Sequence, residues 1–205
     1  MFNLQDTSLK SEGSTAVFPL GISENNELTS VEKGVSKNEA ESIYLKFTFT
    51  HADGSKIYRM EFDPGIQAGV APTEEQKKKV VNINTRVKHI LSKFVEPSQF
   101  PVADTFEQFV DQTIAVLNGK TAGVKLRIKT TYTWNDYVGI PNYVPFVELQ
   151  SEQPTKMRIK SIEDGGIDKM VKDNEDSASD VTAQLSAPAA AAPVASSANE
   201  PNLPF

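Results

Sequence analysis

Hydrophobic and polar residues alternate most clearly in residues 42–50, where every second residue is apolar. The apolar positions are Ile43, Leu45, Phe47 and Phe49. This period of two predicts a half-buried strand. The Asp53-Gly54 pair favours a tight hairpin turn, so we expect residues 56–62 to form the returning strand. Upstream, residues 16–37 show a weaker pattern that predicts one or two short strands.

Two helices are expected in the middle of the chain. Thr73 followed by Gln76 has the pattern of a capping box, and apolar residues with helical spacing continue to about residue 95. A second helix is expected to open at Asp104 and to run to Leu117, with Gly119 in the position of a C-terminal glycine cap.

Strands are predicted again after the helices, in residues 123–133, 143–149 and 155–161. In the first and third of these, basic residues alternate with apolar ones. If the apolar residues face a core, three cations of each strand lie on the opposite face: Lys125, Arg127 and Lys129 in one, Lys156, Arg158 and Lys160 in the other. Neighbouring strands of this kind would form a positive surface able to follow a phosphate backbone. Ordinary solvent-facing lysines are the alternative.

Four aromatic residues lie between the two basic stretches: Tyr132, Trp134, Tyr137 and Tyr143. Bases of any sequence stack on exposed aromatic rings, so a loop of this composition suits sequence-independent binding of single strands. A small apolar cluster that pins the loop is the alternative, particularly for Trp134. Lys46 and Arg59, with Tyr44 and Tyr58, are expected to extend the surface.

Composition changes this picture at the C-terminal end of the chain. The 205 residues carry a net charge of −6, of which −4 falls after residue 165, where six acids meet two bases. That region is rich in Ala, Pro and Ser and is expected to be disordered. Its last three residues are apolar, and Leu203, Pro204 and Phe205 are expected to dock on a partner protein. The acidic stretch could also occupy the basic groove; an accidental terminus is the alternative.

The tail resembles that of phage and bacterial single-stranded DNA-binding proteins, which end in an acidic segment closed by a short apolar tip. This resemblance implies an OB-like domain over residues 1–165, mainly β, built as a five-stranded barrel or a partly open sheet with two inserted helices. A disordered tail, 166–205, would follow it. The resemblance also implies a role in the replication, recombination or repair of phage DNA, with partner proteins recruited through the tip.

Other functions are less favoured by the sequence. There are no cysteines, the N-terminus does not resemble a signal peptide, and no apolar run is long enough to span a membrane. A cytoplasmic protein is therefore expected, and the sequence leaves a homo-oligomer open. His51 and His89 have no catalytic or metal-ligand spacing, so neither enzymatic activity nor a cofactor is expected. A protein-interaction or phage structural module, or an RNA-binding protein, remains the alternative.

Overall fold

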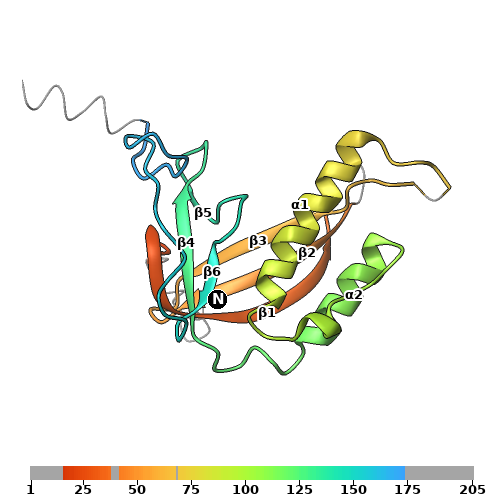
Figure 1. Cartoon of the computed structure of the whole chain (residues 1–205), viewed down its shortest axis with the longest axis horizontal. Helices are drawn as coiled ribbons and strands as arrows, with labels where there is room; N and C mark the ends of the chain where they lie inside the picture. Colours follow the sequence, from red (N-terminus) through yellow and green to blue (C-terminus); the bar gives the residue numbers. More distant parts are fainter. Residues whose placement is uncertain (1–15, 38–41, 68, 174–205) are drawn as a thin grey trace, which may run out of the picture. The chain divides into compact units, whose positions relative to one another are not determined.

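The computed structural model describes residues 16–37, 42–67 and 69–173 (Figure 1). The chain divides into two units, Met1–Met170 and Val171–Phe205, and all helices and strands described below belong to the first. Asp168 is fully buried within that first unit. The predicted boundary after residue 165 is therefore several residues too early.

In the part of the chain that the structure describes, six strands form one antiparallel sheet. They are β1 (Gly21–Val35), β2 (Ile43–His51), β3 (Lys56–Phe62), β4 (Leu126–Tyr132), β5 (Val138–Gly139) and β6 (Val147–Leu149). The strand order is β3-β2-β1-β4-β5, and β6 also pairs with β4. In the described part of the chain no ladder joins β3 to the other end of the sheet. The predicted mainly β architecture is confirmed, as an open sheet with six strands rather than a closed barrel with five.

The β2–β3 hairpin confirms the clearest sequence prediction. The backbone N–H of His51 donates to the Ser55 carbonyl at 2.9 Å, and Gly54 adopts a φ of +87° in the turn. Glycine has no Cβ and tolerates this conformation at little cost. The alternating apolar residues of β2 enter the core, where Leu45, Phe47 and Phe49 are each 0% exposed.

The central strand β1 was underestimated from sequence. It is 15 residues long and pairs with both β2 and β4, whereas only weak strands were expected. Its pairing shifts register twice, and Asn25 has a φ of 59° at one shift. The buried side chain of Asn26 fills the irregularity by donating to the Ser23 carbonyl at 2.9 Å and the Leu126 carbonyl at 3.2 Å. Such bulges bend a strand and break the alternation that sequence analysis looks for.

Both predicted helices are confirmed. Helix α1 (Glu74–Leu91) begins with the expected capping box at Thr73, and α2 (Phe106–Leu117) begins one residue later than expected, with Thr105 as its cap. A short 3-10 helix, Pro97–Gln99, lies between them. The two helices lie over the same face of the β1–β2–β3 part of the sheet (Figure 1). Their apolar stripes complete the core with the inner face of these strands.

Candidate nucleic-acid interface

Strand β4 is buried on both faces, which places two of its cations inside the protein. Leu126 and Ile128 face the core as predicted. Arg127, expected on an open surface, is only 5% exposed. Its guanidinium donates to the carbonyls of Glu152 and Gln150, both at 2.8 Å, and pairs with Glu24 at 2.8 Å. The prediction that this side chain faces solvent is wrong, because residues after β6 cover it.

Lys129 is buried in the same way, at 3% exposed. Its ammonium lies 3.3 Å from the Asp168 carboxylate and donates to the Arg158 carbonyl at 3.3 Å and the Tyr143 hydroxyl at 3.1 Å. These acceptors belong to segments that pack on the second face of β4. Lys129 therefore joins these segments to the sheet, and its predicted position on a solvent-facing surface is also wrong.

Lys125 is the one β4-side cation that stays at the surface. It lies just before the strand, its side chain is 51% exposed, and its ammonium pairs with Glu27 at 2.6 Å. A surface pair of this kind exchanges readily with solvent and other ions. Lys125 remains available to a phosphate, although Glu27 reduces the local positive charge.

The second basic stretch lies beside β4 but is not a strand. Residues 155–160 have no regular secondary structure, so the predicted strand is wrong. All three of its cations, Lys156, Arg158 and Lys160, are nevertheless exposed, and we call them the cation row. Met157, between the first two, is 2% exposed and anchors the segment.

Buried carboxylates fix the backbone of the cation row. Glu148 accepts from the Lys156 N–H at 2.7 Å, and Asp168 accepts from the Lys160 N–H at 2.8 Å. The Asp168 N–H donates in turn to the Lys160 carbonyl at 2.7 Å. The row is thus held at both ends, which keeps three positive side chains together on the surface.

The β4–β5 hairpin, here called the aromatic hairpin, presents two rings to solvent. Trp134 is 86% exposed and Tyr137 is 73% exposed. This exposure excludes the alternative of a small core around Trp134. The Thr133 N–H donates to the Tyr137 carbonyl at 2.8 Å, and Lys169 pairs with Asp136 at 2.6 Å. The hairpin is therefore braced from outside, and its rings need no rearrangement to meet a ligand.

The cation row and the aromatic hairpin lie in the same region of the molecule. The Lys160 backbone N–H donates a hydrogen bond to the Asp168 carboxylate. The next residue, Lys169, accepts from the Tyr132 backbone N–H and donates its ammonium to the Asp136 carboxylate. In Figure 1 the light blue segment, after about residue 155, lies beside β4 and β5. The two basic segments are therefore neighbours, as the sequence hypothesis required, although only the second presents a full set of exposed cations.

The other two rings of the predicted aromatic cluster serve the packing of the protein. Tyr132 and Tyr143 are partly buried. The Lys129 ammonium lies 4.4 Å from the centroid of the Tyr143 ring, a cation–π contact inside the second layer on β4. Only two of the four predicted rings are thus open for stacking.

A second set of exposed rings lies on the face of β2 and β3 that points away from the helices. This outer β2–β3 face includes Tyr44, Lys46, Lys56, Tyr58, Met60 and Phe62. Tyr58 and Phe62 are 48% and 47% exposed, and the Lys46 ammonium lies 4.5 Å above the Tyr58 ring. The sequence analysis missed Met60 and Phe62, although the period of two in residues 56–62 places them beside Tyr58.

Arg59 lies on the opposite side of β3, so its predicted place on this surface is wrong. It is 7% exposed and pairs with Glu61 at 2.7 Å, while Arg86 of α1 pairs with the same carboxylate at 2.6 Å. Arg59 also donates to the Asn142 side chain at 2.9 Å. Its charge is used to join β3, α1 and the loop that follows β5.

The histidines have structural contacts. His89 Nε2 accepts from the backbone N–H groups of Phe146 at 3.2 Å and Val147 at 3.3 Å. Burial, aided by the nearby Lys93 charge, lowers the pKa of His89 to about 4, so the ring is neutral at physiological pH. His51 contacts the Asn26 side chain at 3.1 Å. Within the described ranges, no three His, Asp or Glu side chains are grouped as metal ligands.

Two further findings bear on function. Across the described residues, no helix combines the length and the apolar character needed to cross a bilayer. The predicted docking tip, Leu203-Pro204-Phe205, lies outside the described residues.

No protein-family model matches the sequence, and no curated protein matches it either.

Proposed function

We propose that this protein binds single-stranded DNA without sequence preference, through the aromatic hairpin and the cation row. The observation that carries the proposal is the exposure of Trp134 and Tyr137 on a braced hairpin beside three outward-facing cations. Stacking of a base on an aromatic side chain contributes about 1–3 kcal/mol and tolerates any base. The cations supply the salt-dependent contacts to phosphates.

The outer β2–β3 face offers a path for a longer strand. Tyr58 and Phe62 are open for stacking. Lys46 lies against the Tyr58 ring, and Lys56 lies at the hairpin end of the same face. An OB-like fold, in which single strands lie across the sheet, is part of the proposal and is compatible with the open six-stranded sheet. Lys125, just before β4, is a further candidate for a phosphate contact. The proposed DNA contacts thus fall on two exposed surfaces, the cation row with the aromatic hairpin and the outer β2–β3 face, rather than in one continuous groove.

The biological role follows from the resemblance of the tail. We propose that the protein coats single strands during replication, recombination or repair of phage DNA, in the cytoplasm of a bacterial host. Leu203, Pro204 and Phe205 would bind a replication or recombination protein. The apolar side chains of Leu203, Pro204 and Phe205 suit a small apolar pocket on such a partner.

The test is a titration of labelled oligonucleotides with the full chain at low salt. We expect single-stranded DNA to bind more tightly than duplex DNA, with an affinity that falls as salt rises. Trp134 fluorescence should be quenched, and Trp134→Ala should weaken binding about tenfold, the value of one lost stack. Absence of binding to single strands at low salt would reject the proposal, and clear preference for RNA would reject DNA as the ligand.

A matched pair of triple variants distinguishes specific phosphate binding by the cation row from the effect of the protein's total positive charge. Lys156→Gln/Arg158→Gln/Lys160→Gln removes the row. Lys77→Gln/Lys78→Gln/Lys79→Gln removes the same charge from exposed positions on α1. Each lost phosphate contact reduces the slope of log affinity against log salt by about 0.7 for single strands, so the first variant should lose about 2 from the slope. Equal losses in both variants would mean that the row is not the phosphate site.

A further inference from the structure

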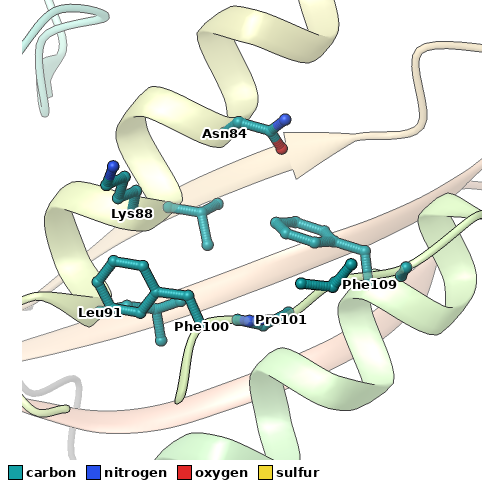
Figure 2. Close-up of a pocket in the computed structure, with 9 residues that line it drawn as sticks. Asn84, Lys88, Leu91, Phe100, Pro101 and Phe109 are labelled. Carbon is teal, nitrogen blue, oxygen red and sulfur yellow. The ribbon is translucent and has the colours of Figure 1, made fainter. Parts of the chain in front are cut away.

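A groove runs between α1 and α2, on the side of the molecule that carries the two helices. It consists of two adjoining hollows of about 720 Å³ and 360 Å³ that share Asn84, Ala103 and Phe109 as lining residues. Figure 2 shows the smaller hollow, in which Leu91, Phe100 and Phe109 surround the space and Lys88 lies at its margin. We call the two hollows together the α1–α2 groove.

The floor of the larger hollow is apolar and partly open to water. Its apolar lining includes Ile43, Ile66, Val70, Val80, Ile83 and Phe106. Ile66 is 41% exposed and Val70 is 59% exposed. Concave apolar surface of this kind loses unfavourable contact with water when apolar side chains of a partner cover it.

The charged residues that line the larger hollow are all acidic. They are Asp63, Asp104 and Glu107, and no Lys or Arg of the described ranges lines this hollow. Lys33 pairs with Glu107 at 2.7 Å, whereas no ion pair within 4.0 Å joins Asp63 or Asp104 to a described residue. The negative field of this rim disfavours nucleic-acid phosphates and favours cations.

We propose that the α1–α2 groove is the docking site for a basic segment of a partner protein that carries apolar side chains at helical spacing. The apolar side chains would fill the hollows, and the basic ones would meet the acidic rim, the helix-in-groove mode of recognition. The chain's own C-terminal region is a poor occupant, because residues 174–205 hold four acids and no base. This proposal does not depend on DNA binding, since the groove shares no residue with the cation row or the aromatic hairpin.

Three synthetic peptides of about 14 residues test the chemistry of the groove. The first has Leu at helical spacing with Lys elsewhere, the second replaces each Leu by Ser, and the third replaces each Lys by Glu. Added to the 15N-labelled full chain, only the first should shift the amide signals of residues that line the groove. Equal shifts from the first two peptides would show attraction by net charge alone and would overturn the proposal.

Variants of the groove complete the test. Ile66→Ser/Val70→Ser should weaken binding of the Leu/Lys peptide at least about fivefold, because both side chains are exposed parts of the apolar floor. Asp104→Asn should weaken it to a smaller extent. Val81→Ser is the matched control, since Val81 is 61% exposed on α1 but does not line the groove. Undiminished binding in the Ile66/Val70 variant, or an equal loss in the control, would contradict the proposal.

Discussion

Glu61, near the C-terminal end of β3, is the shared acceptor of a buried ion-pair network. Its carboxylate is 2% exposed and lies between two guanidinium groups, those of Arg59 and Arg86. Charges out of water are tolerated only when each has a partner and hydrogen bonds. Removal of the single carboxylate would leave two arginines facing each other without a counter-charge in a buried place.

Glu61→Gln should therefore lower the free energy of unfolding by about 3 kcal/mol, the range observed when one partner of a buried ion pair is lost. Urea unfolding followed by circular dichroism measures this. The control is Glu32→Gln, which removes a 57% exposed partner of Lys46 and should cost under about 1 kcal/mol. Equal midpoints for the two variants would mean that the buried network does not stabilise the fold.

His89 is a second residue whose charge state matters to stability. In the folded protein burial lowers its pKa to about 4, below the ordinary value of 6.5. The folded state thus favours the neutral ring, which accepts the N–H groups of Phe146 and Val147. This contribution is complete above the unfolded pKa of 6.5 and is lost as pH falls toward the folded pKa of about 4.

Between pH 7 and pH 5 the protein should lose about 1–2 kcal/mol of stability from this group, after allowance for partial solvent exposure. His89→Gln keeps an acceptor for the two amides but does not titrate. Its urea midpoint should be lower than that of the natural protein at pH 7 and should change less toward pH 5. Parallel pH profiles for the two proteins would rule out His89 as the source of acid sensitivity.

At the scale of elements, the segment from Glu152 to Lys169 behaves as a layer on the second face of β4. Asp168 joins this layer to β4, because its buried carboxylate accepts hydrogen bonds from both the Lys129 ammonium and the Lys160 backbone N–H. Asp168→Asn keeps the shape but removes the charge. We expect it to loosen the cation row and to weaken single-strand binding several-fold, with a loss of about 2–3 kcal/mol of stability.

Both readouts are needed to interpret Asp168→Asn. Binding is measured at a temperature where the variant is still folded by circular dichroism. Asp164→Asn, a charge change four residues earlier at an exposed position, is the matched control. If Asp168→Asn bound single strands like the control, the placement of the cation row would not contribute to binding.

Sequence analysis succeeded for elements whose pattern is local. The β2–β3 hairpin and the two helices follow from alternation, a turn pair and helix caps, each contained in a few residues. Strand β1 was predicted only as one or two short strands, because two bulges interrupt its alternation. The outward orientation of Arg127 and Lys129 was predicted wrongly because alternation separates two faces of a strand but cannot show that a later segment covers one of them.

The same distinction applies to the candidate site. Exposed rings at Trp134 and Tyr137 could be proposed from a polar, glycine-containing loop, and the exposed cations at 156–160 from their alternation with Met157 and Ile159. The burial of Arg59 depends on Glu61, Arg86 and Asn142, which are brought together only by the tertiary fold. The acidic rim of the α1–α2 groove likewise joins residues distant in sequence.

At the scale of the whole molecule, charge is unevenly distributed between the two units. Residues 174–205 hold Glu175, Asp176, Asp180 and Glu200 and no base, so truncation after Asp173 changes the net charge from −6 to −2. An anionic segment attached to the domain repels phosphates and competes for its cations. The truncated chain should therefore bind single-stranded DNA more tightly than the full chain, by about tenfold at low salt and less at high salt.

The truncation point matters to this prediction. A deletion from residue 166, where the tail was expected to begin, would remove Asp168 and release the second layer from β4, so weaker binding would then have a structural cause. A full-length variant with the four acids changed to Asn or Gln separates charge from length. If charge is the cause, this variant should bind like the truncated chain. Tighter binding by the truncated chain alone would instead assign the effect to the removed polypeptide itself, including its Leu-Pro-Phe tip.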